Sequence, residues 1–276
     1  MLSPNASGGG FDSRRLHSSG PQVLRNLGPF VFPGEGSTDA RARFGTPATG
    51  FAADSLGATR VGLSRQGVAG ARCAGPERVL EAVDVVERTP EHWRQMGRAL
   101  ARLHGVKGER FGFETHAYWG SLFQDNTPLE GWVDFFRERR LVPRLRAAIA
   151  SGHLPPDVAA HVERLGDRLP ELCGPPVVPA LLHGDAHQNN FLSTPAGPVL
   201  LDPAVYYGHP ELELAYIDFF APVPEEFFHG YRELAPVDPG FAERRELWRI
   251  PAWLAMVEVD GAQHQDALTK ALRAYE

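Results

Sequence analysis

The sequence LLHGDAHQNNFLSTPAGPVLLD, at residues 181–202, carries the most specific pattern in the chain. Asp185 follows a His-Gly pair, Asn190 stands five residues after it, and Asp202 stands twelve residues after Asn190. Phosphoryl transfer from a nucleotide uses such a set, because one carboxylate orients the attacking hydroxyl and accepts its proton, while an Asn and a second carboxylate hold the metal ions on the phosphates. The segment therefore predicts a phosphotransfer site with Asp185 as the catalytic base.

The same segment predicts its own local structure. The apolar run at residues 177–182 indicates a strand, the polar residues 183–190 indicate a tight loop, and Phe191 starts a second short strand. A Pro-Ala-Gly turn at residues 195–197 precedes a third apolar run at residues 199–201, which leads into the second aspartate. An ordinary hairpin with exposed polar side chains is the alternative. The coincidence of all three polar residues at this spacing favours the site.

Asn190 and Asp202 are the predicted metal ligands. Mg²⁺ prefers hard oxygen ligands and usually takes only one or two of them from protein side chains, with water and phosphate supplying the rest. An Asn carbonyl and an Asp carboxylate at two neighbouring strand ends meet that need. The sequence thus predicts ATP and Mg²⁺ as the cofactors.

The pattern HGDxxxxN, followed by a hairpin and Asp-Pro-Ala, resembles the aminoglycoside phosphotransferase and choline kinase group of protein-kinase-like folds. The sequence DPAVYYGHPE at residues 202–211 narrows the resemblance to the fructosamine kinase family. Upstream, Trp119-Gly120 and the sequence WVDFFRERRL at residues 132–141 resemble that family's insert ahead of the catalytic loop. The resemblance covers roughly residues 90–276.

This resemblance implies an α+β, protein-kinase-like bilobal fold. A degenerate small N-terminal lobe would occupy residues 1–83, and a mainly helical C-terminal catalytic lobe would occupy residues 84–276. The implied activity is an ATP-dependent kinase that phosphorylates a sugar hydroxyl of a ketosamine, which is a sugar adduct on an amine or a protein lysine. Because the phosphorylated adduct is unstable, the activity would amount to deglycation. An aminoglycoside- or choline-type phosphotransferase and an inactive pseudokinase are the alternatives.

The resemblance also implies roles for residues around the loop. His183 would pack and hydrogen-bond to hold the loop that carries Asp185. Glu213 stands where the family has an aspartate that braces the catalytic loop, and Glu211 is a second candidate for such support. A hinge between the lobes would contact the adenine of ATP through backbone groups. The predicted hinge residues are Glu81, Ala82 and Val83.

The N-terminal region departs from the family pattern. Residues 1–50 are rich in Gly, Ser, Pro and Arg and lack the periodicity of helices or strands. Related kinases hold the nucleotide phosphates with an N-lobe lysine that pairs with a helix glutamate, whereas the first lysine here is Lys107, beyond the first helix of the C-terminal lobe. The arginines that could take its place are Arg60, Arg65 and Arg72. An alternative explanation is that the first 50 to 70 residues derive from a misread frame or a degraded gene.

Composition limits the remaining choices. The chain has 276 residues, a hydrophobic fraction of 43% and a net charge of −6, which suits a folded core and shows none of the basic patches typical of nucleic-acid binding. Cys73 and Cys173 fit no metal or redox spacing. No apolar stretch reaches the length that spans a bilayer. We therefore expect a cytoplasmic protein without nucleic-acid or membrane partners, and the sequence leaves its oligomeric state open.

Helical periodicity predicts the elements of the C-terminal lobe. A helix should begin at Thr89-Pro90, where the threonine caps it, and end near Gly105. The segment 111–126 is interpreted as an aromatic loop that could line a substrate pocket. The helix predicted at residues 132–150 carries a run of acids and arginines, which indicates a mostly solvated face. Further helices are expected at residues 158–169, 243–259 and 266–275.

Overall fold

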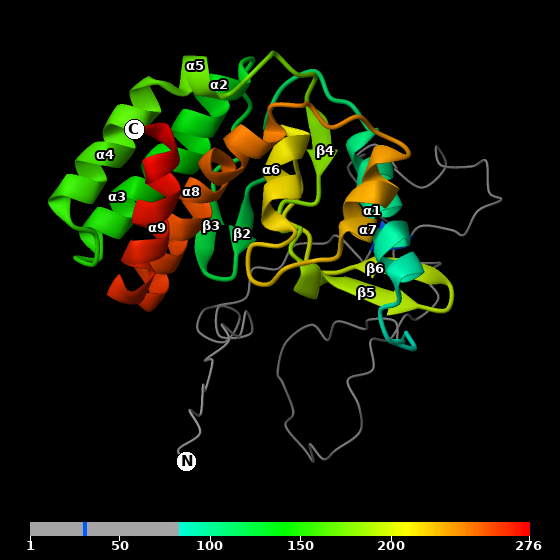
Figure 1. Ribbon diagram of the computed structural model, residues 1–276. Coiled ribbons are helices and arrows are strands. Elements are labelled where there is room, and N and C mark those ends of the chain that lie inside the picture. Colours follow the sequence, from blue (N-terminus) through cyan, green and yellow to red (C-terminus); the bar gives the residue numbers. More distant parts are fainter. Residues whose placement is uncertain (1–29, 32–82) are drawn as a thin grey trace, which may run out of the picture.

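Figure 1 shows the chain as a computed structural model, which describes Phe30–Val31 and residues 83–276. The predicted hinge residues Glu81 and Ala82, like the arginines considered as replacements for a lysine, lie outside the described residues. Across the described ranges, every helix is too short or too polar to cross a membrane.

Helices make up most of the described chain, and its strands are short. The helices are α1 (Pro90–His104), α2 (Trp132–Phe135), α3 (Val142–Ala150), α4 (Pro156–Asp167), α5 (Leu169–Leu172), α6 (Pro210–Tyr216), α7 (Glu225–Arg232), α8 (Phe241–Asp260) and α9 (Gln265–Leu272). The strands are β1 (Phe30–Val31), β2 (Ala117–Trp119), β3 (Leu122–Gln124), β4 (Ala180–Leu182), β5 (Phe191–Thr194), β6 (Gly197–Leu200) and β7 (Tyr206–Gly208). The predicted α+β fold with a mainly helical C-terminal lobe is confirmed.

Helix α1 begins where the sequence predicts. The Thr89 hydroxyl accepts a hydrogen bond from His92 N at 3.3 Å, and His92 Nδ1 accepts one from Thr89 N at 3.1 Å. Pro90 fits the first turn because an N–H at that position would have no partner within the helix. The buried face of the helix packs against α7.

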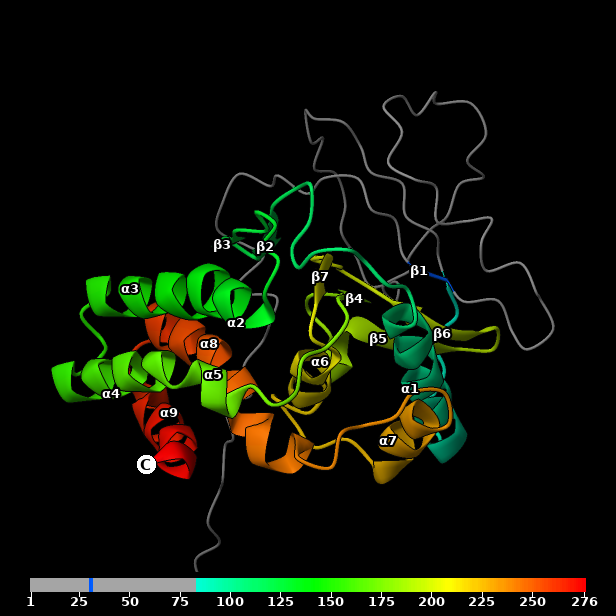
Figure 2. The same ribbon diagram turned by 90° about the horizontal axis from the view of Figure 1, so that it is seen from above.

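Two hydrophobic clusters build the body of the molecule. Helices α3, α4, α8 and α9 gather at one end, while α1 lies along α7 at the other, an arrangement that Figures 1 and 2 show from two sides. Between them, β4 and α6 contribute to both clusters: Leu182 and Leu212 belong to the first, and Leu181 and Leu214 belong to the second. Fully burying one such leucine stabilises the fold by about 1.5–3 kcal/mol.

The strands pair locally. β4 and β7 are antiparallel, with Leu182 opposite Tyr206. β5 and β6 form the hairpin predicted after Asn190, with Thr194 opposite Gly197, and β1 pairs with the outer side of β6. The β4–β7 pair and the β5–β6 hairpin thus frame the loop that carries the predicted catalytic residues.

The helix predicted at residues 132–150 forms with a change of winding. A π-helical segment, Phe136–Leu141, lies between α2 and α3. The predicted solvated face is wrong for two of its arginines: Arg140 is 2% exposed and Arg144 is 8% exposed. The Arg140 guanidinium lies 4.1 Å from the centroid of the Tyr206 ring, and its two terminal nitrogens donate to the Asp125 carbonyl and to Asn126 Oδ1. Charge alone therefore misjudged the location of these side chains.

The segment 111–126, interpreted from sequence as a loop, contains the β2–β3 hairpin. Tyr118 pairs with Phe123, and Trp119 pairs with Leu122. Successive residues of a strand face opposite sides, so Tyr118 and Phe123 lie on the exposed face, while Leu122 is buried on the other. The hairpin stands between the two ends of the molecule in Figure 1, close to the chain that follows β4.

Candidate active site

The loop after β4 has a backbone shape that only glycine accommodates. Gly184 adopts φ +86°, and a Cβ placed there would lie 1.9 Å from the carbonyl oxygen of Ala204. Ala204 N in turn donates to the His183 carbonyl at 2.7 Å. The glycine of the His-Gly-Asp motif is therefore required because the loop and the segment after Asp202 approach backbone to backbone.

Asp185 and Asn190 are brought together. Asn190 Nδ2 donates to the Asp185 carbonyl at 2.8 Å and to its Oδ2 at 3.1 Å. The side chain of Asp185 remains 23% exposed. Burial raises the pKa of Asp185 to about 7, and the negative charges of Asp202 and Glu213 raise it too, while the Asn190 hydrogen bond opposes the rise. The carboxyl therefore titrates close to neutral pH.

Asp202 lies across from this pair. Its backbone adopts φ +51°, a conformation uncommon for a residue with a Cβ, and its side chain is exposed. Leu201 N donates to the Asn190 carbonyl at 2.8 Å, which ties the end of β6 to the short helix that contains Asn190. The negative charge of Asp202 raises the pKa of Asp185, after the larger effect of burial.

The oxygens of Asn190 and Asp202 suit a hard cation. Because Asn190 Nδ2 is committed to Asp185, the amide carbonyl is the group that Asn190 can offer to a metal. Within Phe30–Val31 and residues 83–276, no group of three or more His, Cys, Asp or Glu side chains is arranged to hold a metal. An ion with few protein ligands and phosphate oxygens for the rest, as Mg²⁺ takes, fits this donor set.

The carboxylate of Glu213 binds the backbone of the His-Gly-Asp loop. It accepts hydrogen bonds from His183 N at 3.0 Å and from Gly184 N at 2.5 Å. His104 Nε2 lies 2.8 Å from the same carboxylate, and His104 Nδ1 lies 2.7 Å from the Tyr231 hydroxyl. All of these side chains are buried. A chain of hydrogen bonds thus connects α7, α1 and α6 to the backbone of the His-Gly-Asp loop.

Glu211, the other acid predicted to support the loop, faces away from it. Arg244 binds its carboxylate through two hydrogen bonds of 2.9 and 2.7 Å, and Trp248 Nε1 donates to it at 3.0 Å. Glu211 and Glu213 are two residues apart on a helix of 3.6 residues per turn, so their side chains cannot share a face. Glu211 thus connects α6 to α8, whereas Glu213 contacts the loop, and a supporting role of Glu211 stays a prediction.

His183 and Val83 are the remaining predicted site residues in the described part of the chain. His183 is fully buried, its Nδ1 accepts a hydrogen bond from Asp185 N at 3.3 Å, and burial lowers its pKa. Val83 is half-buried, and it precedes α1 in a segment without regular structure. No nucleotide contact can be assigned to Val83 from its position alone, so its place in a hinge stays a prediction.

Sequence reasoning missed three side chains near the loop. Trp119 Nε1 donates to the Gly184 carbonyl at 2.8 Å. Arg88 donates to the carbonyls of Gln188 and Phe191, on either side of Asn190, at 2.8 and 2.6 Å. His187 Nε2 lies 3.7 Å from Asp185 Oδ1. His187 lies within the motif, and Trp119 lies in a segment singled out for its resemblance to the family, although its contact with the loop was not predicted. Arg88 reaches the loop from a distant part of the chain and gave no signal.

The fold and the loop together define the class of the molecule. An aspartate on a glycine-dependent turn, an Asn bonded to it and a second aspartate after the next hairpin are carried on a mainly helical α+β body, as in the catalytic lobe of protein-kinase-like proteins.

Comparison with known proteins places the chain within that class. A family model described as fructosamine kinase matches residues 78–275. A probable ketoamine kinase from Synechocystis sp. is 34% identical over 201 residues, which cover 71% of this chain and 66% of that protein. A probable ketoamine kinase from Escherichia coli K12 is 30% identical over 184 residues, which cover 65% of this chain and 63% of that protein. The chain belongs to the fructosamine kinase family.

Solved structures agree with this assignment. The crystal structure of a putative fructosamine-3-kinase from Thermobifida fusca superposes with a TM-score of 0.68 at 36% identity, covering 70% of this chain and 68% of that one. A putative fructosamine-3-kinase from Haemophilus somnus shares the fold, with a TM-score of 0.63 at 22% identity over 72% of this chain and 68% of that one. The chain spans about two thirds or less of the length of the curated relatives named above.

Proposed function

We propose that this chain is an ATP-dependent, Mg²⁺-dependent kinase that phosphorylates a sugar hydroxyl of ketosamines. The observation that carries the proposal is the pairing of Asp185 with Asn190, beside Asp202, on a loop whose backbone is fixed by Gly184 and Glu213. Phosphoryl transfer demands positioning and charge neutralisation more than covalent work by the protein. A rigid loop that presents one base and two oxygen ligands suits that demand.

Asp185 takes the role of general base in this proposal. Its carboxylate would accept a hydrogen bond from the acceptor hydroxyl, orient it toward the γ-phosphate and take up its proton. Asn190 and Asp202 would hold Mg²⁺, which neutralises charge on the phosphates when it is bound with ATP. A general base works best when its pKa lies near the operating pH, because a large fraction is then ionised and the carboxylate still binds a proton well. The pKa of about 7 for Asp185 meets this condition at neutral pH.

The acceptor is proposed from the family. Fructosamine and ribulosamine adducts on amines or protein lysines carry the hydroxyl that such a kinase would phosphorylate, and the product would decompose to release the amine. Relatives with 30–34% identity are described as probable ketoamine kinases. ATP supply, and a reducing setting that suits the buried free thiol of Cys173, support a cytoplasmic reaction.

An acceptor panel tests the proposal. The purified chain is incubated with ATP and Mg²⁺ and with fructose-lysine, ribulose-lysine, choline or an aminoglycoside, and ADP release is measured beside phosphorus NMR of the product. We expect transfer to a ketosamine, with a new phosphate-ester signal that disappears as the adduct breaks down. Transfer to choline or the aminoglycoside alone would replace the ketosamine assignment by another acceptor of the same fold.

A second candidate is a binding module that no longer transfers phosphate. The lysines of this chain are Lys107 and Lys270. Lys107 Nζ donates to the His104 carbonyl at 2.6 Å, and Lys270 lies on α9 in the last part of the chain, so neither is placed as the phosphate-binding lysine of related kinases. Losing one such electrostatic contact slows transfer by a factor of about 100 or more. ATP binding without transfer to any acceptor in the panel would favour this candidate.

A further inference from the structure

The indole of Trp119 makes direct contact with the backbone of the catalytic loop. Trp119 closes strand β2, and its Nε1 donates to the Gly184 carbonyl at 2.8 Å. That carbonyl belongs to the peptide group that joins Gly184 to Asp185. The side chain on the β2–β3 hairpin is therefore one peptide unit from the carboxylate proposed as the base.

The other polar atoms around this peptide group are also fixed. Asp185 N donates to His183 Nδ1 at 3.3 Å, and Gly184 N donates to Glu213 at 2.5 Å. Together with the Trp119 contact, these make three hydrogen bonds around the Gly184–Asp185 peptide. His183, in the loop, and Glu213, on α6, are the partners in two of them. The third comes from Trp119, so the orientation of the Gly184–Asp185 peptide depends on where the hairpin stands.

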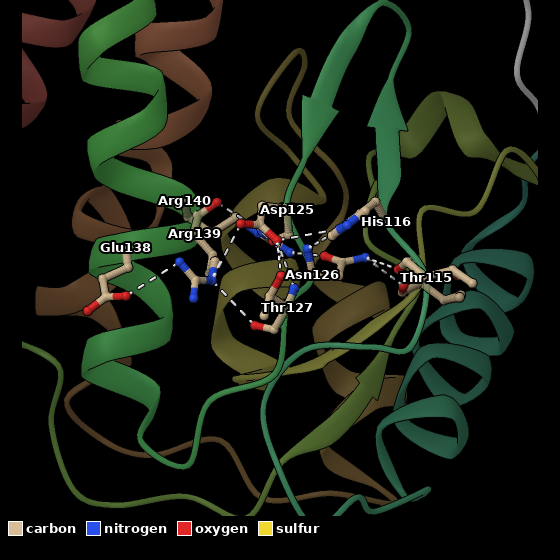
Figure 3. Close-up of polar contacts among 9 residues, drawn as sticks. Thr115, His116, Asp125, Asn126, Thr127, Glu138, Arg139 and Arg140 are labelled. Carbon is tan, nitrogen blue, oxygen red and sulfur yellow. Dashed lines mark hydrogen bonds and ion pairs between the residues drawn. The ribbon is translucent and has the colours of Figure 1, made fainter.

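The hairpin is itself anchored by buried arginines. Arg144 Nη2 donates to the Phe123 carbonyl on β3 at 2.8 Å. Arg140 donates to the Asp125 carbonyl at 2.7 Å and to Asn126 Oδ1 at 2.6 Å, contacts that Figure 3 shows between the π-helical segment and the end of the hairpin. A buried guanidinium that donates to backbone and amide oxygens holds those groups firmly, because breaking a hydrogen bond would leave both partners buried and unsatisfied.

Asn126, which accepts a hydrogen bond from Arg140, also binds the segment that follows Asp202. Asn126 Nδ2 donates to the Thr115 carbonyl at 3.1 Å and to the Val205 carbonyl at 3.4 Å. Val205 follows Asp202 by three residues. The hairpin is thus fastened both to the helix at residues 132–150 and to the segment that carries the second aspartate.

Trp119 differs from its neighbour Tyr118. The Trp119 ring packs edge-on against Tyr216 of α6, with ring centroids 5.8 Å apart. The Tyr118 ring lies on the exposed face of the hairpin against Phe123. One hairpin strand therefore offers an aromatic side chain directed at the loop beside one directed away from it.

We propose that Trp119 is a positioning residue for Asp185: its indole N–H, held by the arginine-anchored hairpin, sets the orientation of the Gly184–Asp185 peptide and so the aim of the carboxylate at the acceptor. The proposal rests on the proposed kinase function. Trp119 acts through the backbone of the loop and does not itself exchange a proton with the acceptor.

A pair of matched variants tests it. Trp119→Phe removes the N–H and keeps an aromatic ring against Tyr216, while Tyr118→Phe removes one polar group from the adjacent, outward-facing side chain. We expect Trp119→Phe to lower kcat about 10- to 100-fold, because small displacements of a reacting group have effects of this size, with KM for ATP and the thermal unfolding midpoint unchanged. Tyr118→Phe should leave kcat unchanged. Unchanged kcat in Trp119→Phe, or an equal fall in both variants, would overturn the proposal.

A spectroscopic measurement separates this proposal from the kinase assignment. The indole N–H resonance of Trp119 in the full chain is identified by its loss from Trp119→Phe. Asp185→Asn should shift that resonance and leave those of Trp248 and Trp253 in place, because Trp119 Nε1 donates to the Gly184 carbonyl, in the peptide group that precedes residue 185, whereas Trp248 Nε1 donates to Glu211. If the wild-type chain transfers no phosphate, the kinase proposal fails on its own. A Trp119 resonance that does not respond to Asp185→Asn overturns the contact itself, whatever the activity.

Discussion

Helix α6 lies between two regions of the molecule, and it presents one buried glutamate to each. The two carboxylates differ in the groups that they bind. On the side of α1 and α7, Glu213 accepts from the backbone of His183 and Gly184 and lies against His104. On the side of α8, Glu211 binds Arg244 and Trp248. Both carboxylates are buried, and both are fully engaged.

The difference between the two regions lies in the partner of each carboxylate. Glu213 accepts hydrogen bonds from the main chain of the His-Gly-Asp loop, so a change there would move the groups proposed to carry out the chemistry. Glu211 accepts hydrogen bonds from side chains of α8, so a change there would loosen the packing of α6 against α8. Burial and charge alone do not distinguish a residue that supports catalysis from one that supports folding.

Of the changes that compare these two regions, Glu213→Gln should have the largest effect on kcat. A glutamine can accept from one of the two N–H groups, but its own NH₂ then faces the other N–H. One backbone N–H of the loop is therefore left without an acceptor. We expect kcat for ketosamine phosphorylation to fall about 100-fold, with a loss of about 2 kcal/mol in the free energy of unfolding. Steady-state kinetics and denaturant unfolding measure the two effects, and a variant with wild-type kcat would remove the distinction between the two regions.

Glu211→Gln is expected to lower the stability of the fold and to leave kcat unchanged. The change leaves the Arg244 guanidinium with less compensation for its burial, so the free energy of unfolding should fall by about 3 kcal/mol. The kcat of the folded protein, measured well below its unfolding temperature, should stay at the wild-type value. A fall in kcat as large as that of Glu213→Gln would show that α8 communicates with the loop.

The α8 side should also contribute to the acid sensitivity of the fold. Burial lowers the pKa of His209, at the start of α6, to about 4 from an ordinary value of 6.5, and nearby Arg244 lowers it too, against the opposing effect of Glu211. Between those two pH values the unfolded chain binds a proton that the folded chain does not, so stability falls as the pH drops from about 6.5 to about 4. The pKa difference limits this loss to about 3 kcal/mol.

His209→Asn is the matched control for that acid effect. His209 Nδ1 accepts a hydrogen bond from Glu211 N at 3.2 Å, and an asparagine at the same N-cap position can accept it without titrating. Denaturant unfolding at pH 7 and at pH 5 should show a smaller loss of stability in the variant. Equal losses in both proteins would assign the acid sensitivity to other groups.

The smallest effect is expected at the start of α1. Thr89→Ala removes the hydroxyl that accepts from His92 N and should cost about 1 kcal/mol in the free energy of unfolding. Because Thr89 lies one helix length from His104, kcat should not change. An altered kcat would mean that the beginning of α1 also takes part in placing the loop.

Local patterns predicted the elements around the site. The cap at Thr89 and the Pro-Ala-Gly turn after β5 depend on neighbouring residues, and both were read from the sequence. The proximity of Asp185 and Asn190 was likewise predicted from their spacing in one loop. Such features are encoded within a few residues, which is why sequence reasoning found them.

Contacts between distant segments were not predictable in the same way. Trp119 and Gly184 are 65 residues apart, and no periodicity links them. Arg140 and Arg144 were expected in solvent because they are charged, yet their partners are carbonyl and carboxylate groups that only the folded chain brings near. The opposite faces of Glu211 and Glu213 follow from helix geometry, but the element on each face follows from the tertiary structure.

The proposed mechanism depends most directly on the carboxylate of Asp185. The decisive measurement compares phosphoryl transfer from ATP to fructose-lysine by the wild-type chain and by Asp185→Asn, with Mg²⁺ present and ATP affinity measured in parallel. We predict transfer by the wild type and a fall of about 10²- to 10⁴-fold in kcat for the variant, with ATP binding retained. Equal rates in the two proteins would contradict the assignment of Asp185 as the base, and ATP binding without transfer by the wild type would contradict the proposed phosphorylation of fructose-lysine.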